Sequence, residues 1–389
     1  MRICLINSLY GPPQRGGAEV IVDLIAHSLV ASGHQVFIIT TATESAIKKE
    51  QYNKQGEIGV FRLPSYNITT FANLSRLGPF LRLWWHIFDI FNWRQAAHLR
   101  RILKKIQPDF IWSHNHMGLG VMSWKQLAAY PATWFMSLHD VQYYDPSGLI
   151  LWPDKVSFFY KVARAVYSRL MRYLLPLPDQ LISPSQWLWD FYKTKKYWPA
   201  VPALVLRQPA PLDSKTVTDS LDFIWLFVGQ LEPHKGVDFL LKLWSAYKPK
   251  AQAEEKLIII GDGSLQDKVV SNSSCDDSIV YLGRQTNDIV NGYLRQGAAL
   301  LMPTMCYENS PTIIAQAQSF GGAILASRLG GIPEMLVAKN QWALPPADLN
   351  AWLTTMVDLR NNNQLWRLTP TKKIIDASTY CAAVLAKLK

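Results

Sequence analysis

Two successive series of short apolar runs alternate with segments of helical periodicity in this chain. The first series opens with an apolar run at 2–9, a helical pattern at 18–32 and a second apolar run at 36–40. The second series opens with an apolar run at 223–228 and a helical pattern at 237–247. Such alternation predicts parallel sheets covered by helices. We therefore expect an α/β protein built from two Rossmann-like domains.

A proline-rich stretch at 207–213 separates the two series and is interpreted as the interdomain linker. The length of 389 residues points the same way, because it exceeds what one ordinary hydrophobic core holds. We place the first domain at 1–205 and the second at 206–372. A last segment, 373–389, carries one further helical pattern.

The composition is that of a folded protein, with 49% hydrophobic and 18% charged residues. Four scattered cysteines, at positions 4, 275, 306 and 381, argue against a disulfide framework or a zinc site. The chain opens on a strand-like run instead of a signal peptide, and its uncharged stretch at 309–327 contains glutamines and glycines. These features favour a cytoplasmic protein without a membrane span.

The positive charge is concentrated in the first half of the chain. Residues 1–200 hold 22 Lys/Arg and 12 Asp/Glu, a net charge of +10, whereas residues 201–389 hold 18 and 17, a net charge of +1. Such asymmetry suggests an acidic partner for the first half: a membrane surface, a phosphorylated acceptor or nucleic acid.

The segment 303–334 reads as a strand end, a loop with Glu308, a helix, a short strand and a Gly-Gly loop that ends in Glu334. Gln316 stands eight positions after Glu308, about two turns into the expected helix, and Pro311 lies near its first turn. The free N–H groups and dipole of a helix start suit oxygen-rich ligands. A nucleotide-sugar fits this combination of amides, carboxylate and carboxamide.

This segment resembles the signature of the retaining GT-B glycosyltransferases, specifically glycosyltransferase family 4. The family pattern has a Glu, seven residues, a second Glu, an apolar strand and a Gly-Gly-x-x-Glu loop. Glu308 matches the first acid and Gly330 to Glu334 match the loop, whereas Gln316 replaces the second acid. The resemblance implies the GT-B architecture of two Rossmann-like domains, with the segment 373–389 packing back on the first.

The resemblance extends to the loop 229–236, which is similar to the family's phosphate-binding Gly-Arg-Leu-x-x-x-Lys-Gly loop. It implies that Lys235 neutralises the donor diphosphate. Gln230 replaces the expected Arg and can hydrogen-bond a phosphate without neutralising it. Gly283 and Arg284 are implied to lie beside the nucleotide base. An ordinary solvated loop lysine is the alternative for Lys235.

Around Glu308, the resemblance implies contacts to the donor sugar and stabilisation of an oxocarbenium-like transition state. Gln316 would hydrogen-bond the ribose. The backbone of Asn309, Ser310 and Pro311, together with Thr312, would meet the sugar. The alternatives are a surface-loop glutamate at 308 and a tolerated core glutamine at 316.

The first domain offers three further candidates at the ends of its strands. Gly16 and Gly17 follow the first strand and open a helix, where phosphate or sugar can approach the backbone, although an ordinary turn would look the same. The pair His139 and Asp140 follows the apolar run at 133–138, a good position for chemistry. The resemblance implies that the histidine contacts the donor sugar or the acceptor.

Two more histidines, His114 and His116, follow the preceding strand and would line the acceptor side; loop polarity is the alternative. Neither this pair nor the pair of His139 and Asp140 shows the ligand spacing of a zinc site. No Asp-x-Asp triplet occurs in the sequence, so we expect no metal cofactor and a diphosphate held by lysine and helix dipole.

Aromatic and basic residues are interleaved over 80–105, and basic residues recur over 160–173. This mixture suits a membrane interface, and peripheral attachment to the cytoplasmic leaflet is one hypothesis. Two amphipathic helices packed on the core, with a solvated basic face, are the other.

The sequence therefore predicts a metal-independent, retaining hexosyltransferase with a nucleotide-diphosphate sugar as donor. The acceptor is a glycan or lipid-linked molecule, in cell-surface polysaccharide synthesis, and no nucleic-acid partner is expected. Two alternatives stay open. One is a non-catalytic binding protein, because Gln230 and Gln316 remove charges of the family pattern. The other is a Rossmann-type dehydrogenase, which lacks its complete glycine fingerprint here.

Overall fold

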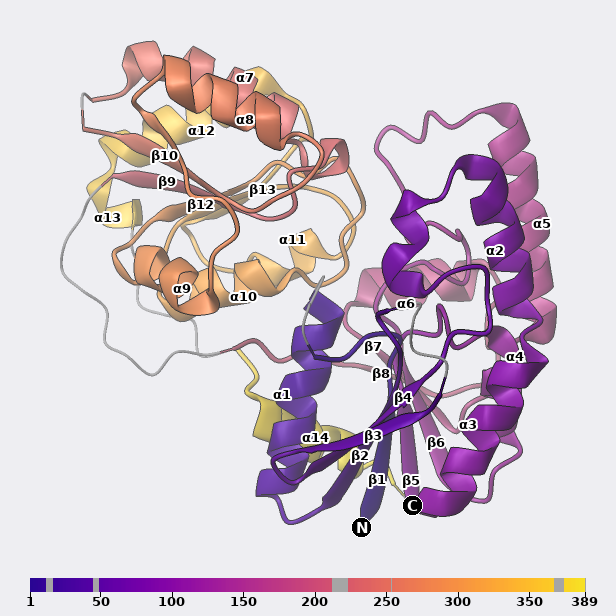
Figure 1. Cartoon of the computed structure of the whole chain (residues 1–389). Coiled ribbons are helices and arrows are strands. Elements are labelled where there is room, and N and C mark those ends of the chain that lie inside the picture. The colour runs from indigo at the N-terminus through magenta and orange to yellow at the C-terminus, as the bar shows by residue number, and fades with distance from the viewer. Residues whose placement is uncertain (12–16, 45–48, 212–222, 253, 367–373, 389) are drawn as a thin grey trace. The chain divides into compact units, whose positions relative to one another are not determined.

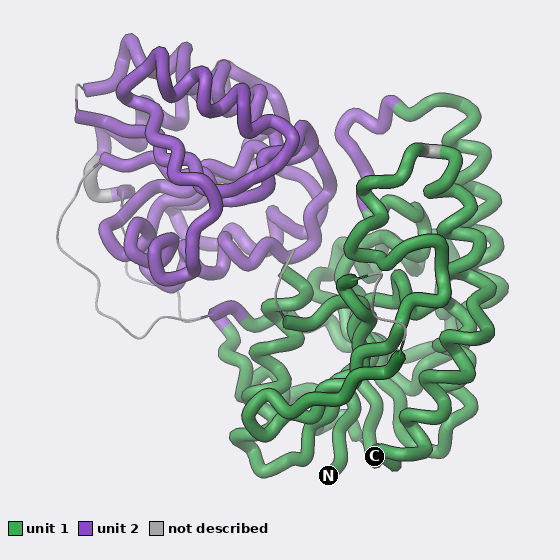
Figure 2. Tube along the Cα trace, in the orientation of Figure 1, with its two compact units in different colours: residues 1–148, 156–209, 375–389 green, residues 149–155, 210–374 purple. Residues whose placement is uncertain are grey.

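The computed structural model describes the chain except for residues 12–16, 45–48, 212–222, 253, 367–373 and 389 (Figure 1). The chain divides into two compact units (Figure 2). Unit 1 contains residues 1–148, 156–209 and 375–389, and unit 2 contains residues 149–155 and 210–374. Each unit is an α/β layered structure around its own sheet, which confirms the predicted fold class.

The sheet of unit 1 has eight strands in the order β3-β4-β2-β1-β5-β6-β7-β8. All neighbours are parallel except β3 and β4, which form an antiparallel edge. Its strands are β1 (Arg2–Ile6), β2 (Gln35–Thr41), β3 (Gln51–Gln55), β4 (Ile58–Leu63), β5 (Phe110–Ser113), β6 (Thr133–Ser137), β7 (Gln180–Ser183) and β8 (Ala203–Val205).

Helices cover both faces of this sheet (Figure 1). They are α1 (Gly17–Ala31), the short η1 (Phe71–Arg76), α2 (Pro79–Ile90), α3 (Trp93–Ile106), α4 (Val121–Ala128), α5 (Phe158–Leu174), α6 (Gln186–Thr194) and the C-terminal α14 (Ala377–Leu385). The last helix packs beside α1, where Tyr380 stacks on Trp112 with ring centroids 5.9 Å apart. The end of the chain thus completes the core of unit 1.

The sheet of unit 2 has six parallel strands in the order β11-β10-β9-β12-β13-β14. Its strands are β9 (Ile224–Val228), β10 (Lys256–Ile260), β11 (Ile279–Tyr281), β12 (Ala299–Met302), β13 (Ile324–Ser327) and β14 (Gln341–Leu344). Its helical elements are η2 (Pro233–Lys235), α7 (Val237–Tyr247), η3 (Lys248–Lys250), α8 (Gln266–Cys275), α9 (Asn287–Arg295), α10 (Thr312–Ser319), α11 (Ile332–Met335), α12 (Leu349–Asn361) and α13 (Asn363–Trp366).

Each strand order contains a topological switch point, where the strands that follow in sequence are added on the opposite side of the first strand. In unit 2 the switch lies between β9 and β12, and in unit 1 between β1 and β5. Crevices outside the carboxyl ends of such strands are where open α/β sheets bind ligands. The residues that follow β9 and β12, and those that follow β1 and β5, are therefore the first places to look for a site.

Two boundaries differ from those expected from the sequence. The division between the units falls after Pro209 instead of after residue 205, because the 207–209 stretch packs with the first unit. Residues 149–155, expected in the first domain, belong to unit 2. In the part of the chain that the structure describes, no helix has the length and apolar character needed to cross a membrane.

Candidate functional site

An ion pair between Lys235 and Glu308 lies at the switch point of unit 2. Lys235 ends η2 in the loop after β9, and Glu308 lies in the loop between β12 and α10. The distance from Lys235 Nζ to Glu308 Oε1 is 2.5 Å, and the two side chains are 24% and 18% exposed. The fold thus brings together the two residues that the sequence singled out most strongly, from positions 73 apart.

Backbone packing fixes this pair in place. Gly236 has φ +78°, and a Cβ there would collide with the carbonyl oxygen of Pro303. The carbonyl of His234 accepts hydrogen bonds from the Met305 N–H (2.8 Å) and the Thr304 hydroxyl (3.2 Å). The lysine loop and the glutamate loop are therefore joined along their main chains, with no room for a larger residue at 236.

The Gly-Gly loop holds Glu308 from the other side. The Gly331 N–H donates to the Glu308 carbonyl at 2.7 Å. Gly330 has φ +64°, and a Cβ there would collide with that same carbonyl. The glycines of the predicted Gly-Gly-x-x-Glu loop thus serve close backbone packing, and Glu334 lies in the short helix α11 that follows.

The pairing keeps both charges at neutral pH. Burial alone would favour the neutral forms, but the Lys235 ammonium holds the pKa of Glu308 below its usual value, and the glutamate in turn raises the pKa of Lys235. Beside them, burial and then the lysine charge lower the pKa of His234. The site therefore combines a neutral imidazole with a balanced cation and anion.

Cys306 is a neighbour of Glu308 that sequence reasoning did not single out. Its thiol donates to Glu308 Oε1 at 3.5 Å and lies 3.3 Å from the Thr304 hydroxyl. Burial, followed by the nearby carboxylate, raises the pKa of this thiol to about 12. Cys306 is therefore a neutral donor to the glutamate. Its spacing of two residues from Glu308 is the only signal that the sequence offered.

The segment 149–155 also supports the glutamate loop. Leu151 forms an antiparallel bridge with Cys306, the Trp152 N–H donates to Met305 O (2.7 Å), and the Tyr307 N–H donates to Ile150 O (3.0 Å). Sequence reasoning missed this contact, because no local pattern indicates pairing between segments more than 150 positions apart.

The remaining donor-side residues surround the same strand ends. Gln230 is exposed in the loop after β9. Gly261 and Gly263 pack against the backbone of Gly229 and Leu231, so the Gly-Asp-Gly turn has a structural role. The Gly283 carbonyl accepts from Gly261 N–H at 2.9 Å. The next side chain, Arg284, is more than half exposed and lies 3.9 Å from Asp262.

Helix α10 begins at Thr312, directly after Pro311, which occupies the N-cap position. Gln316 therefore lies about one turn into the helix instead of the two that its spacing from Glu308 suggested, because Asn309 and Ser310 are not helical. Gln316 is 4% exposed. A buried side-chain amide needs hydrogen-bond partners. Burying it costs less free energy than burying a carboxylate, because the amide carries no charge.

In unit 1, His114 and His139 meet although they follow different strands, β5 and β6. His114 Nδ1 lies 2.9 Å from His139 Nε2, and Gln208 Nε2 lies 2.8 Å from His139 Nδ1. Since the glutamine amide donates, His139 carries its proton on Nε2 and passes a hydrogen bond to His114. The remaining His114 donor, Nε2, is buried and has no acceptor among the residues that the structure describes.

These histidines are neutral. Burial lowers the pKa of His139 to about 4 and that of His114 well below its usual value. His116 is buried and stacks on Tyr143 at 4.8 Å, and burial lowers its pKa to about 3. Burial raises the pKa of Asp140 to about 6, and its carboxylate accepts from the Gln142 N–H at 2.8 Å.

Among the sequence candidates of the first βα turn, Gly17 is the first residue of α1, whereas Gly16 lies outside the described residues. The structure places His139 in unit 1 and Glu308 in unit 2. Within the described part of the chain, no cluster of three or more His, Cys, Asp or Glu side chains is arranged to hold a metal ion.

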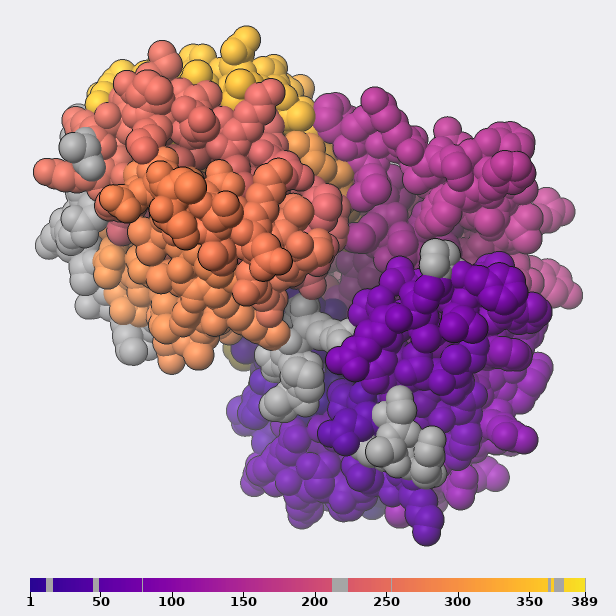
Figure 3. Space-filling view, turned by 45° about the horizontal axis from the view of Figure 1, so that its top comes forward, coloured from indigo at the N-terminus to yellow at the C-terminus, as the bar shows by residue number. Residues whose placement is uncertain are grey.

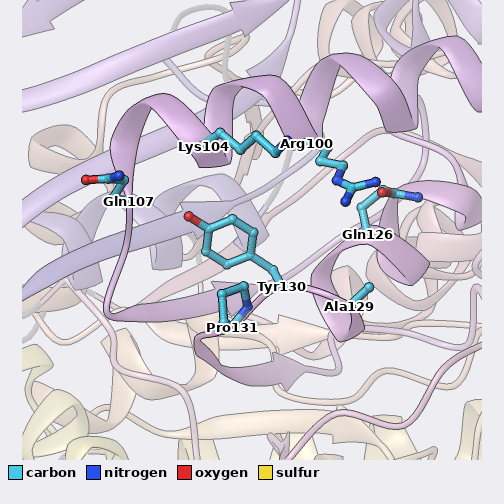
Figure 4. Close-up of a pocket in the computed structure, with 7 residues that line it drawn as sticks. All are labelled: Arg100, Lys104, Gln107, Gln126, Ala129, Tyr130 and Pro131. Carbon is cyan, nitrogen blue, oxygen red and sulfur yellow. The ribbon is translucent and has the colours of Figure 1, made fainter.

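A separate depression lies on unit 1 and shares no residue with these sites (Figure 4). Its volume is about 380 Å³. Arg100 and Lys104 of α3 line one side, and Tyr130 and Pro131 lie opposite (Figure 4). It adds two cations to the outer surface of that unit.

Comparison with known proteins agrees with the site. Residues 15–199 match the family model Glycosyltransferase Family 4, and residues 222–362 match Glycosyl transferases group 1. A 42.6 kDa protein in the cps region of Klebsiella pneumoniae is 24% identical over 344 residues, which are 86% of this chain and 87% of the relative.

A lipopolysaccharide 1,2-N-acetylglucosaminetransferase of Salmonella typhimurium is 24% identical over 183 residues, 41% of this chain and 48% of that protein. The solved structure of Anabaena Alr3699/HepE in complex with UDP superimposes with a TM-score of 0.62 at 13% identity, over 100% of this chain and 95% of that one. The likeness to that structure shows the shared GT-B fold. From its two domain matches, the chain belongs to the group 1, family 4 glycosyltransferases.

Proposed function

We propose that this chain is a retaining glycosyltransferase that moves a hexose-type sugar from a nucleotide-diphosphate donor to a glycan or lipid-linked acceptor. The observation that carries the proposal is the Lys235–Glu308 pair at the switch point of unit 2. A cation and an anion held side by side, each largely shielded from water, match a departing diphosphate and a developing positive charge on the sugar ring.

In the reaction proposed here, the bond between the anomeric carbon and the diphosphate oxygen breaks and a bond to the acceptor hydroxyl forms. The Lys235 ammonium stabilises the negative charge on the departing diphosphate. A diphosphate that draws this ammonium away leaves the Glu308 carboxylate free to face the oxocarbenium-like sugar. The leaving phosphate oxygen takes the proton of the acceptor hydroxyl. No protein nucleophile is assigned.

Other residues have binding roles in this proposal. Gln316 and the backbone from Asn309 to Thr312 hold the ribose and the sugar, and the loop at Gln230 contacts phosphate. Gly283 and Arg284 lie beside the base. The His114 Nε2 donor, which has no partner within the described residues, supports a role in contacting a ligand oxygen in unit 1. His139 orients that donor through its own hydrogen bonds.

We further propose that the reaction needs no metal, because the sequence has no Asp-x-Asp triplet and Lys235 supplies the balancing charge. The lipopolysaccharide enzyme among the relatives supports a role in cell-surface polysaccharide synthesis. With an acceptor of that kind, we propose a cytoplasmic protein that works at the inner face of the membrane. No nucleic-acid partner is proposed.

The first experiment is a thermal-shift screen of UDP-, GDP-, ADP- and TDP-sugars, with the free nucleotides alongside. Because HepE was solved with UDP, UDP-sugars come first. A donor at about 100 times its Kd adds about 2.7 kcal/mol to stability and should raise the Tm by several degrees. Lys235→Met, which keeps the length but removes the charge, should lose most of that shift.

A donor that shifts the Tm is then offered with glycan acceptors, and release of free nucleotide is measured with and without EDTA. Loss of turnover in EDTA would contradict metal independence. Binding without any transfer or hydrolysis would favour the non-catalytic alternative, which the neutral Gln230 and Gln316 keep open. No shift with any nucleotide would overturn the proposed function.

A further inference from the structure

Helix α2 presents an apolar face to solvent. Its exposed apolar positions recur at helical spacing and carry large side chains, and Arg82 is the one exposed charged residue of the helix. These exposed residues are Phe80, Leu81, Leu83, Trp84, Ile87 and Phe88, followed after the helix by Phe91 and Trp93. Trp84 lies between Phe80 and Phe88, with ring centroids 6.3 and 6.0 Å apart. A continuous apolar patch of this kind on a folded protein marks an interaction surface.

The opposite side of α2 is buried in unit 1 and hydrogen-bonded there, which leaves the apolar face in solvent. Trp85 is fully buried, and its indole N–H donates to the Thr69 carbonyl at 2.8 Å. The one acidic residue of the helix, Asp89, is buried and accepts from the Gly118 N–H at 3.1 Å. Arg82 turns back to the carbonyls of Ser75 and Leu77. The charged residues of α2 thus point away from the aromatic row.

Helix α5 carries a second exposed apolar face, flanked by cations. Phe158, Phe159, Val162, Val166 and Tyr173 are exposed, and so are Lys161, Arg169 and Arg172. The basic Arg164 instead turns inward, with Nη1 3.5 Å from Asp145 Oδ2. The outer face of α5 therefore combines apolar side chains and positive charge.

The two helices are neighbours on one side of unit 1 (Figure 1; violet and magenta in Figure 3). Asp89 of α2 is close enough to Tyr167 of α5 to add to the effect of burial in raising the pKa of that tyrosine. The two apolar faces therefore lie on neighbouring helices of unit 1. Arg94, in the first turn of the next helix, α3, is exposed directly after Trp93.

We propose that the exposed faces of α2 and α5 dock on an anionic lipid bilayer. The aromatic side chains would enter the interfacial region, and the cations of α5, together with Arg94, would meet lipid phosphates. A second copy of the chain is the poorer occupant, because it would bring Lys161, Arg169 and Arg172 against like charges. The inference rests on the proposed function in one respect: such a surface would hold the enzyme beside a lipid-linked acceptor.

The test is co-sedimentation of the full chain with vesicles of phosphatidylcholine mixed with phosphatidylglycerol, and with phosphatidylcholine alone. At low salt we expect binding to the mixed vesicles only, weakened by added salt as screening grows. Trp84→Ser/Phe88→Ser should weaken binding at least about tenfold, since two large apolar side chains would no longer be buried in the bilayer interface. Lys161→Glu/Arg169→Glu should have a similar effect at low salt and little at high salt.

A matched control is Val270→Ser/Ile289→Ser, which removes two apolar side chains of unit 2 that are 42% and 41% exposed, close to the 42% of Trp84. These changes should leave vesicle binding intact. All variants replace exposed side chains, so circular dichroism and Tm should match those of the parent chain.

Lack of binding to the mixed vesicles, or binding that the α2 and α5 variants do not change, would overturn the proposal. An oligomer in light scattering that Trp84→Ser/Phe88→Ser makes monomeric, without vesicle binding, would assign the surface to a second copy. The assay uses no nucleotide, so its failure leaves the donor-site results untouched, and a failed donor screen leaves vesicle binding measurable.

Discussion

The switch points of the two units both bury ionisable groups, but they do so with opposite outcomes. In unit 2, Lys235 and Glu308 face one another and remain charged. In unit 1, His114 and His139 have each other and the Gln208 amide as hydrogen-bond partners, and burial keeps them neutral. Burial by itself removes charge, whereas burial with a counter-charge preserves it. Unit 2 is therefore suited to stabilising charge that develops in a reaction, and unit 1 to hydrogen bonding.

The largest effect on this contrast between the units is expected from removing the negative charge of Glu308. Glu308→Gln keeps the shape but leaves the Lys235 ammonium without its partner and the sugar cation without an anion. We expect transfer to fall about 100- to 1000-fold, the usual effect of losing one electrostatic contact to the transition state. Single-turnover rates at saturating donor measure this.

A matched control is Glu255→Gln, a buried carboxylate in unit 2 that accepts from Tyr247 and Trp225 away from the site. It should lower stability but leave the rate of the folded protein near that of the parent chain. Equal rates for Glu308→Gln and the parent would contradict the assigned role.

The next largest effect is expected from disturbing the backbone packing beside the charged pair of unit 2. Gly236→Ala combines a positive φ with a collision against Pro303, so we expect a loss of about 2–5 kcal/mol in the free energy of unfolding. Gly33→Ala has nearly the same φ, +81°, with nothing within 4 Å of the added carbon, and should cost only about 1–2 kcal/mol. Urea denaturation of both variants would test the difference, and equal losses would show that the close approach of the two loops is unimportant.

The neutral histidines predict how stability depends on pH. The pKa of His139 is about 4 in the folded chain and near 6.5 when unfolded, so the unfolded state binds more protons between these values. Stability should therefore be complete above pH 6.5 and should fall as the pH drops towards 4. Asp140 acts in the opposite sense, because its folded pKa, about 6, lies above its usual 3.8.

His139→Gln should flatten this dependence by on the order of 1–3 kcal/mol across that pH window. Urea unfolding at a series of pH values is the measurement. A slope that the substitution leaves unchanged would mean that His139 is not held neutral.

The smallest effect is expected from adding a positive charge to the site of unit 2. Gln230→Arg restores the cation of the family pattern at an exposed position of unit 2. Because the position is open to solvent, the gain in donor affinity should be about three- to tenfold and should shrink with salt. Calorimetric titration with the donor found in the screen gives the value. A weaker affinity would indicate that the loop at Gln230 does not face the phosphates.

Much of the fold was predictable because it depends on local patterns. The limits of α7 agree with those expected from the sequence, since it is a periodic segment bounded by turn residues. The antiparallel strand β3 and the edge strand β14 were not expected. Neither segment is a continuous apolar run. An edge strand pairs on one side only, so its sequence is less constrained than that of a central strand.

The sequence also could not decide between the two hypotheses for residues 80–105. An apolar helical stripe looks the same whether it faces a core or solvent. The structure divides the stretch into α2 and α3 at Phe91 and Asn92 and turns the aromatic row of α2 outward. The side of a helix that packs is set by its connections and neighbours, which local periodicity does not contain.

The sequence by itself determined the α/β class, the family and the positions of Lys235 and Glu308 within motif-bearing loops, because these follow from periodicity and short spacings. Only the tertiary structure decided that Leu151 pairs with Cys306 beside the glutamate, and that Gln208, in a stretch interpreted as a linker, orients His139. The physical reason is that hydrogen bonds between distant segments depend on sheet order and packing, which form only when the whole chain has folded.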